Sequence, residues 1–236
     1  MEIKILFDRQ KLDKNFLAGW GVSYLIGNHL LFDTGETPDC LLHNMSHMNV
    51  KIEDIKKVVI SHDHFEHIGG LWEILQGNPG VDLYVCAGFS NDFRKKAKSF
   101  ECNIIEVEPF MEIGEGIHTT GQLEKRYGQD HVVEQALVLQ TPKGVTIVTG
   151  CAHPGIINMV EIVKKHTLKD VYLIIGGFHL MGSSHRELLH VNNRLMELRV
   201  EHVGPGHCTG EEAESIFQKS FGKNFIDVKA GKNIDV

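Results

Sequence analysis

Short hydrophobic segments separated by Gly- and Pro-containing turns run through most of the chain. Residues 22–26 and 29–32 flank a Gly27-Asn28 pair, and this pattern predicts a β-hairpin. Further strands are expected at 3–7, 57–60, 81–86, 104–107, 116–120, 132–140, 145–149, 171–175, 200–203 and 225–228. Helices are expected at 37–48, 71–75, 93–97, 156–166, 184–198 and 211–221. This succession predicts an α/β protein with two packed sheets and helices outside them.

Length and composition narrow the class of protein. A chain of 236 residues is long enough to bury a core that needs neither a disulfide nor a metal. The formal charge of −7 argues against a broad surface for nucleic acid or for an anionic membrane. Residues 1–5 lack the apolar core of a signal peptide, and no apolar run approaches the roughly 18 residues of a membrane helix. The five scattered cysteines contain no CxxC pair, which favours reduced thiols and a cytoplasmic protein.

The segment Ser-His-Asp-His-Phe-Glu-His-Ile-Gly-Gly at 61–70 concentrates potential metal ligands between an expected strand and an expected helix. Side chains two residues apart in an extended segment point the same way, so His62 and His64 can bind one cation. Glu66 and His67 lie after the turn and can bind a neighbouring cation. Neutral imidazole and carboxylate suit Zn, Mn or Fe. The alternative is a solvated polar loop in which the histidines occur by chance.

Three more histidines, His153, His179 and His207, follow expected hydrophobic strands in loops that contain Gly or Pro. If these strands run in the same direction, their ends meet at one edge, where the 61–70 segment is also expected. A histidine of this kind is more often structural when it occurs alone. Together with the 62–67 cluster, the three histidines predict a metal centre.

Two cysteines, Cys151 and Cys208, flank these histidines. Each fits either a thiol ligand or a small buried residue. Neither stands in a sequence setting that lowers the pKa of a thiol, so neither is expected to be a nucleophile.

The motifs together resemble the metallo-β-lactamase superfamily. The resemblance lies in His62-x-His64-x-Glu66-His67, His153, His207 and the earlier Leu31-Phe32-Asp33-Thr34-Gly35. Segments 134–137, 149–156, 176–180 and 206–210 look like the subgroup that includes the dihydropterin–ribofuranosylaminobenzene 5′-phosphate synthases. The resemblance covers essentially the whole chain. It implies a single domain over residues 1–236, an αββα sandwich of two mixed sheets flanked by helices.

The resemblance also implies roles for individual residues. His62, His64 and His153 would bind one metal ion, and Glu66, His67 and His207 would bind a second. Asp33 would be a buried carboxylate that orients a ligand loop. An Asp that forms a turn before Gly35 is the alternative for that residue.

This chain departs from the superfamily pattern at two places. Glu66 stands where Asp is usual, and its longer side chain is expected to bind differently or to act mainly as a base. Gly176 and Gly177 stand where an Asp commonly bridges the two metals. The second metal is therefore expected to bind weakly, to be absent or to be held by other residues. His179 is therefore a candidate ligand, a candidate substrate contact or a structural residue.

The expected function is hydrolysis of a phosphoester or a similar small anionic molecule by a water that a metal activates. One or two divalent ions are expected, with Zn favoured and Mn or Fe as alternatives. Glu66 would orient the water or move its proton, and His179 or His185 would stabilise a substrate oxygen. Gly176 and Gly177 would leave room for substrate and offer backbone N–H groups.

Two other functions remain open at this point. One is a transferase that resembles the pterin synthase, and the other is a non-catalytic metal-binding sensor. Neither a nucleic acid nor a membrane is expected as a partner, and the oligomeric state is left open.

Overall fold

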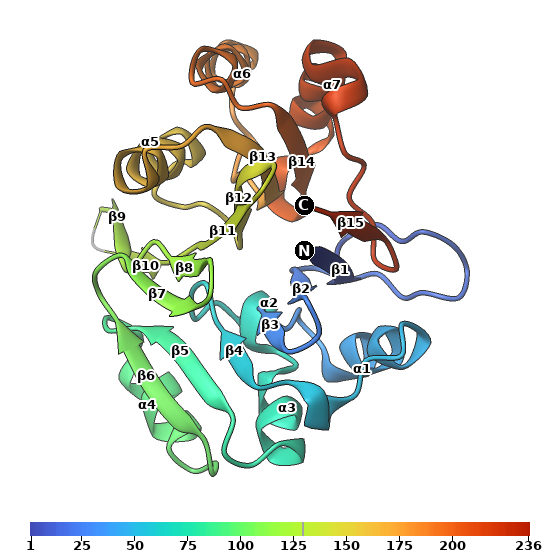
Figure 1. Ribbon diagram of the computed structural model, residues 1–236, viewed down its shortest axis with the longest axis vertical. Helices are drawn as coiled ribbons and strands as arrows, with labels where there is room; N and C mark the ends of the chain where they lie inside the picture. The colour runs from blue at the N-terminus through green and yellow to red at the C-terminus, as the bar shows by residue number, and fades with distance from the viewer. Residues whose placement is uncertain (129) are drawn as a thin grey trace. The chain divides into compact units, whose positions relative to one another are not determined.

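Each of two units in the chain is built on one large mixed sheet (Figure 1). The computed structural model describes residues 1–128 and 130–236. The first unit comprises Met1–Glu108 and Lys229–Asp235, and the second comprises Pro109–Val228 with Val236. The single domain expected over 1–236 stays a prediction.

The first unit contains a seven-stranded sheet in the order β15-β1-β2-β3-β4-β5-β6. Its strands are β1 (Glu2–Phe7), β2 (Ser23–Ile26), β3 (Leu30–Phe32), β4 (Lys57–Val59), β5 (Asp82–Cys86), β6 (Asn103–Val107) and β15 (Asn233–Asp235). Its helices are α1 (Pro38–His47), α2 (Phe65–Ile68), α3 (Leu71–Gly77), α4 (Asn91–Ala97) and the 3₁₀ helix η1 (Ile52–Asp54). Strands β3 to β6 pair in parallel, so the segments that follow β3 and β4 leave the sheet at the same edge.

Helix α1 is joined to the sheet by a buried asparagine. Of the apolar stripe expected from Leu41, Leu42, Met45 and Met48, Leu41 and Met45 are buried and the other two are half-buried. Asn44, which is 0% exposed, donates to the carbonyl oxygens of Leu6 (2.8 Å) and Leu17 (2.9 Å). Its own Oδ1 accepts from the N–H of Leu17 at 2.8 Å. One side chain therefore satisfies backbone groups of β1 and of the 8–20 loop.

The second unit contains a six-stranded sheet in the order β14-β13-β12-β11-β8-β7, and a separate two-stranded sheet of β9 and β10. The strands are β7 (Met111–Gly114), β8 (Ile117–Thr119), β9 (Leu123–Tyr127), β10 (Asp130–Glu134), β11 (Leu137–Thr141), β12 (Gly144–Thr149), β13 (Val171–Gly177) and β14 (His202–Gly206). The helices are α5 (Ile156–Thr167), α6 (His185–Glu197), α7 (Glu211–Phe221), η2 (His207–Thr209) and η3 (Gly222–Asn224). Helices α5, α6 and α7 contribute Met159, Leu195 and Phe217 to a core shared with the sheet.

Strands β12, β13 and β14 run parallel and are adjacent, as the expected convergence of their ends requires. Thr149 pairs with Gly176, and Gly177 pairs with Gly206. The segments after these three strands therefore start at one edge of the sheet. Those segments carry the histidines singled out in the sequence.

The prediction of one long strand at 132–140 is wrong. The segment forms β10 and β11, which belong to different sheets, with a break at Gln135 and Ala136. The N–H of Ala136 donates to Thr120 Oγ1 at 3.0 Å instead of to a strand. Glu134 and Gln135 are buried polar residues whose side chains accept from the N–H of Cys151 and from Thr119 Oγ1, and these contacts interrupt the strand.

The last strand is also displaced from its expected position at 225–228. That segment makes only an isolated bridge between Phe225 and Val203, with a hydrogen bond from the N–H of Ile226 to the oxygen of Val203 at 2.8 Å. The final strand is β15, which pairs antiparallel with β1. The apolar pattern at 225–228 reflects partial burial against β14 rather than a ladder.

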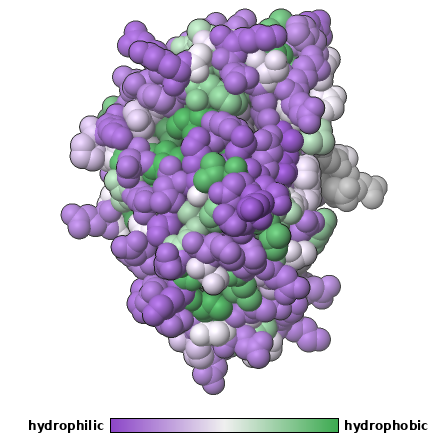
Figure 2. All heavy atoms as spheres, turned by 90° about the vertical axis from the view of Figure 1, so that its right-hand side faces the viewer, coloured by the Kyte–Doolittle hydropathy of each residue, from purple (hydrophilic) through white to green (hydrophobic). Residues whose placement is uncertain are grey.

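The described residues contain no helix that is both long and apolar enough to cross a membrane. One face of the molecule, drawn in Figure 2, is mainly hydrophilic, and its hydrophobic side chains form small separate patches. Apolar groups scattered in this way are ordinary on folded proteins.

We expect Asn44→Ala to destabilise the protein by about 3 kcal/mol, because it leaves buried backbone groups of Leu6 and Leu17 without their partner. Asn28→Ala, at an exposed position of the β2–β3 turn, is the matched control and should change stability by less than about 0.5 kcal/mol. Urea unfolding of the two variants measures the difference. Equal stability of both variants would contradict the role given to Asn44.

Candidate metal centre

The first unit gathers three imidazoles around the start of α2. The ring of His62 lies 4.5 Å from that of His64 and 4.1 Å from that of His67, centroid to centroid. His62 and His67 are both 0% exposed. The ligand atoms of His62 and His64 lie within 4.8 Å of each other, and so do those of Glu66 and His67. Imidazole nitrogens gathered this closely can bind a cation as neutral ligands.

Asp33 organises this cluster from the end of β3. Its Oδ2 accepts from His67 Nδ1 and from Ser61 Oγ, each at 2.7 Å, and its Oδ1 accepts from the N–H of Ser61 at 2.7 Å. Ser61 Oγ lies 2.8 Å from His62 Nδ1 and accepts from it, since its own proton goes to Asp33. Both histidines therefore present Nε2 as the acceptor nitrogen that a cation requires. Thr34 adds a bond from Oγ1 to the oxygen of His67 at 2.8 Å.

Burial raises the pKa of Asp33, although the His67 imidazole and the donors of Ser61 favour its ionised form. The carboxylate is 0% exposed and thus depends on those donors for its charge. Its contacts are those of a residue that holds ligands in place. The alternative of a simple turn-forming Asp explains none of the bonds to Ser61 and His67.

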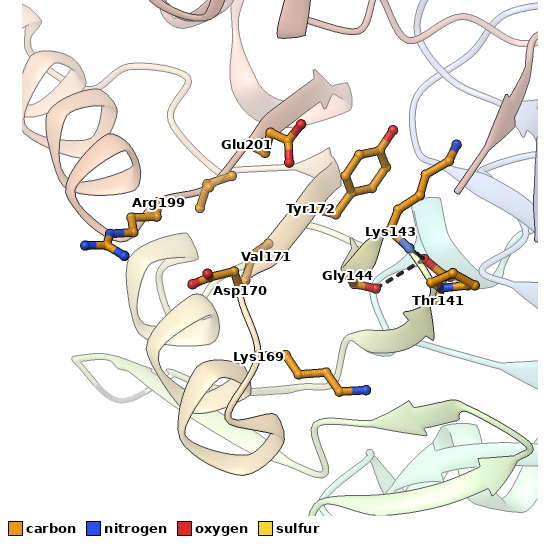
Figure 3. Close-up of a pocket in the computed structure, with 11 residues that line it drawn as sticks. Thr141, Lys143, Gly144, Lys169, Asp170, Val171, Tyr172, Arg199 and Glu201 are labelled. Atoms are coloured by element: carbon orange, nitrogen blue, oxygen red, sulfur yellow. Dashed lines mark hydrogen bonds between the residues drawn. The ribbon is translucent and has the colours of Figure 1, made fainter.

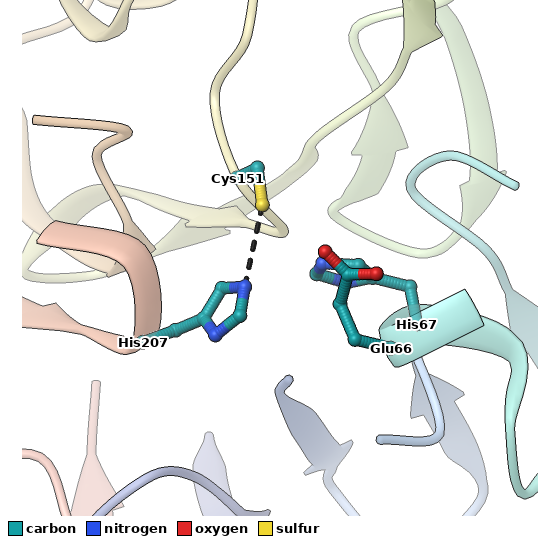
Figure 4. Close-up of side chains that lie close together, drawn as sticks. All are labelled: Glu66, His67, Cys151 and His207. Carbon is teal, nitrogen blue, oxygen red and sulfur yellow. Dashed lines mark hydrogen bonds between the residues drawn. The ribbon is translucent and has the colours of Figure 1, made fainter. Parts of the chain in front are cut away.

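The second unit gathers its own candidate ligands after β12, β13 and β14. The ligand atoms of Cys151, His153 and His179 lie within 4.8 Å of one another. His207 Nε2 is 3.3 Å from Cys151 Sγ, the dashed line of Figure 4. Figure 4 also draws Glu66 and the neighbouring His67 of α2 in the first unit. The sharing of one cation by ligands of both units stays a prediction.

Glu134 orients a histidine in the second unit as Asp33 does in the first, and no role for Glu134 was predicted from the sequence. Its Oε1 accepts from the N–H groups of Cys151 (2.9 Å) and Ala152 (2.7 Å). Its Oε2 accepts from the N–H of His153 at 2.7 Å and from His153 Nδ1 at 2.9 Å. One buried carboxylate thus binds the whole 151–153 turn and orients the imidazole. The only indication of this role in the sequence was the pair of polar residues, Glu134 and Gln135, within an otherwise apolar segment.

Burial alone would raise the pKa of Glu134, but the hydrogen bond and charge of His153, with the backbone donors, hold it below its usual value. Glu134 is therefore ionised at neutral pH. Its negative charge favours a protonated Nδ1 on His153 and leaves Nε2 for a cation.

Cys208 differs from the sequence expectation. Burial would raise the pKa of its thiol, but hydrogen bonds with Cys151 and His179, and the charge of His179, lower it to about 6. The sequence could not reveal this setting, because His179 and Cys208 are brought together by β13 and η2. Cys208 Sγ also lies 3.7 Å from the carbonyl oxygen of Cys151.

Left-handed backbone conformations mark the ligand segments of both units. Asp33, Ala152, His179 and His207 have φ between 46° and 63°. Such conformations cost a non-Gly residue of order 1–3 kcal/mol and occur where surrounding contacts impose them. Three other cases lie at the C-terminal ends of α1, α5 and α6, where a left-handed residue is ordinary: Asn49, Leu168 and Arg199. The strain at the ligand segments has no such explanation and indicates a built site.

The residues expected to bind substrate lie in different settings. His179 is exposed and its ring lies 4.4 Å from that of buried His153. His185 is exposed at the start of α6, and its Nδ1 is 2.8 Å from Glu212 Oε1. The N–H of Gly177 already donates to Gly150 at 3.0 Å. A substrate role for His179, His185, Gly176 and Gly177 stays a prediction.

A cavity of about 690 Å³ lies at the opposite ends of the second unit's strands (Figure 3). Residues at the starts of β12 and β13 line it, and Thr141 Oγ1 donates to the oxygen of Gly144 there at 3.2 Å. Ligands of open parallel sheets bind beyond the carboxyl ends of the strands. The cavity is therefore a separate feature from the histidine cluster.

The donors fit a transition-metal cation well. Imidazole nitrogens, a carboxylate and a thiol are the ligands that zinc prefers, and the imidazoles of His67 and His153 have the carboxylate partner typical of metal-bound histidine. The residues expected to be ligands in the first unit cluster with each other. In the second unit His153 and His207 each lie near Cys151.

The comparisons with known proteins agree with this interpretation. Residues 21–207 match the family model described as "Metallo-beta-lactamase superfamily". The chain is 29% identical to the "7,8-dihydropterin-6-methyl-4-(beta-D-ribofuranosyl)-aminobenzene-5'-phosphate synthase" of Methanocaldococcus jannaschii, over 93% of this chain and 90% of that protein. It is 29% identical to the solved structure of Tm1679, "a metal-dependent hydrolase of the beta-lactamase superfamily", with a TM-score of 0.85 over 100% of this chain and 99% of that one.

YhfI from Bacillus subtilis, a "metallo-beta-lactamase fold protein", is 14% identical, with a TM-score of 0.71 over 99% of each chain, and shows the fold alone. The expected fold class, two mixed sheets flanked by helices in a metallo-β-lactamase fold, is confirmed.

We expect Glu134→Gln to weaken metal binding by roughly 10–100-fold, because the amide cannot accept at both oxygen positions of the turn that orients His153. Glu115→Gln, at an exposed position of the same unit, should bind metal like the unsubstituted protein. Competition with a chromogenic chelator measures both affinities. Unchanged affinity in the Glu134 variant would refute its orienting role.

Proposed function

The chain belongs to the metallo-β-lactamase superfamily, and from this we propose that it is a metal-dependent hydrolase of a phosphoester or a similar small anionic molecule. The description of Tm1679 as a metal-dependent hydrolase supports the proposal. The superfamily resemblance assigns the ligands to two cations, Zn²⁺ first among the candidates. The first cation would take His62, His64 and His153, and the second would take Glu66, His67 and His207. Such cations lower the pKa of water towards about 7 and polarise a phosphoryl oxygen.

The observation that carries the proposal is the pair of buried carboxylates. Asp33 and Glu134 each accept from Nδ1 of a histidine, at 2.7 Å and 2.9 Å respectively. A buried carboxylate–imidazole pair stabilises a fold poorly for its cost of desolvation. The same pair orients an imidazole well for a metal, and the protein has built one in each unit.

Other residues near the ligands supply the remaining roles. Glu66 is a carboxylate next to His67 and would orient or deprotonate the attacking water. His179 is exposed beside His153 and would donate to a substrate oxygen. His185 is the weaker candidate for that task, since Glu212 engages its Nδ1.

The second candidate is a transferase related to the pterin synthase. The 29% identity to that synthase extends over 93% of this chain, and the identity to Tm1679 is also 29%. The two functions differ in the acceptor, water or an arylamine phosphate, and share the ligands. In either case the proposed substrate is a small anion and not a nucleic acid, in keeping with the formal charge of −7.

We expect a chelator to abolish hydrolysis of a chromogenic phosphodiester and Zn²⁺ to restore it. His62→Ala should lower the rate by at least tenfold, since losing even an outer partner of a ligand costs roughly 10–100-fold. The control His190→Ala, at an exposed position of α6, should retain full activity. Melting temperature should change little in either variant, because a core of this size needs no metal.

A rate that is insensitive to the chelator would refute metal dependence. If hydrolysis is absent but a pterin diphosphate reacts with an arylamine phosphate, the transferase is the function. A metal-bound protein that unfolds on loss of the metal and turns over neither substrate would point to the sensor.

We expect His179→Asn to lower kcat/KM by roughly 10²-fold while the metal content stays unchanged, because the residue donates to a substrate oxygen. Elemental analysis of the same samples distinguishes this role from that of a metal ligand, because loss of a ligand would lower the metal content together with the activity. His185→Asn is the comparison variant and should lose less. Loss of metal from the His179 variant would show that the residue is a ligand instead.

A further inference from the structure

The end of β13 has no space for the carboxylate that commonly bridges two metals in this superfamily. A Cβ added to Gly177 would lie 2.7 Å from Cys208 Sγ and would also meet the carbonyl oxygen of Gly150. A Cβ added to Gly176, whose φ is +127°, would lie 2.6 Å from Thr149 Oγ1. The two glycines are therefore required by packing, and any anionic bridge comes from another residue.

Cys151 lies among the histidines of the second unit. Its side chain is 2% exposed, and its Sγ is 3.3 Å from His207 Nε2. Its Sγ also lies within 4.8 Å of the ligand atoms of His153 and His179. His153 and His207 are the two ligands of this unit that the superfamily resemblance assigns to different cations. One sulfur atom thus neighbours a ligand of each.

We propose that Cys151 is a metal ligand of the second unit, and that its thiolate would supply the negative charge that the missing carboxylate would otherwise bring to the centre. This proposal rests on the metal centre proposed above. The Cys151 thiol loses its proton to solvent when the cations bind, and the sulfur then forms the metal bonds, so charge and atoms balance.

The chemistry of the site favours this assignment. Imidazoles are neutral ligands, so a centre without the bridging carboxylate lacks one negative charge. A thiolate restores that charge and is a preferred ligand of Zn²⁺, whereas Mn²⁺ prefers oxygen ligands. Glu134 fixes the backbone N–H of Cys151 at 2.9 Å, so the same carboxylate that orients His153 also positions the sulfur.

Cys208 provides a matched control. It is a second buried thiol at the same sheet edge, but its Sγ lies against the backbone oxygen of Cys151 at 3.7 Å and against the α-carbon side of Gly177. Cys208 fills the space beside Gly177 and contacts His179 and Cys151, whereas Cys151 also neighbours His153 and His207.

The test loads the metal-free full-length protein with Co²⁺ and records the near-ultraviolet absorption, where sulfur-to-cobalt charge transfer appears. The unsubstituted protein and Cys208→Ser should both show this band, and Cys151→Ser should lose it. Cys151→Ser should also bind Zn²⁺ at least tenfold more weakly by chelator competition, since losing an outer partner alone costs roughly 10–100-fold. Circular dichroism confirms that each variant is folded.

The unsubstituted protein alone can overturn the proposal, whether or not the variants fold. If Co²⁺ binds in stoichiometric amount without a thiolate band, Cys151 is not a ligand, while the metal-dependent function stands. A band that survives in Cys151→Ser and disappears in Cys208→Ser would show that Cys208, and not Cys151, is the sulfur ligand. If elemental analysis finds that the protein binds no metal at all, the proposed function fails together with this inference.

Discussion

The buried carboxylate–imidazole bond is the interaction on which the rest of the site depends. Asp33 and Glu134 are both 0% exposed, and each must find donors for its lone pairs or pay several kcal/mol. Each finds them in one short segment: Ser61 and His67 for Asp33, and the 151–153 turn for Glu134. The carboxylates therefore set the path of the backbone and the direction of the imidazoles together.

The parallel part of each sheet explains why such a bond can form. In the first unit β3 and β4 end side by side, so Asp33 reaches Ser61 across adjacent strands. In the second unit β12, β13 and β14 are parallel neighbours, and the segments that follow them contain Cys151, His179 and His207. The left-handed conformation of Ala152 is tolerated because Glu134 accepts from its N–H and from those of its two neighbours.

The two glycines at the end of β13 connect this architecture to the chemistry. From the sequence alone, glycines at these positions indicate that the usual bridging carboxylate is missing. Packing gives the departure another meaning, because Cys208 and the backbone of Gly150 occupy the space next to Gly177. A centre in which sulfur supplies the charge of the missing carboxylate would be softer and would favour zinc. Hydrolase and transferase chemistry are both compatible with it, since the ligands are common to the two.

Sequence by itself determined the elements whose signals are local, the histidine-rich motif at 62–67 and the superfamily, because hydrophobic period, turn residues and motif spacing are properties of short segments. It also placed His153, His179 and His207 at strand ends. Tertiary structure decided what depends on contacts between distant segments: the break of 132–140 at Gln135, the role of Glu134 and the position of Cys151 beside His207. A polar residue in an otherwise apolar segment cannot be assigned a role from the sequence until its hydrogen-bond partner is known. That partner is fixed by strand order and register, which no local pattern records.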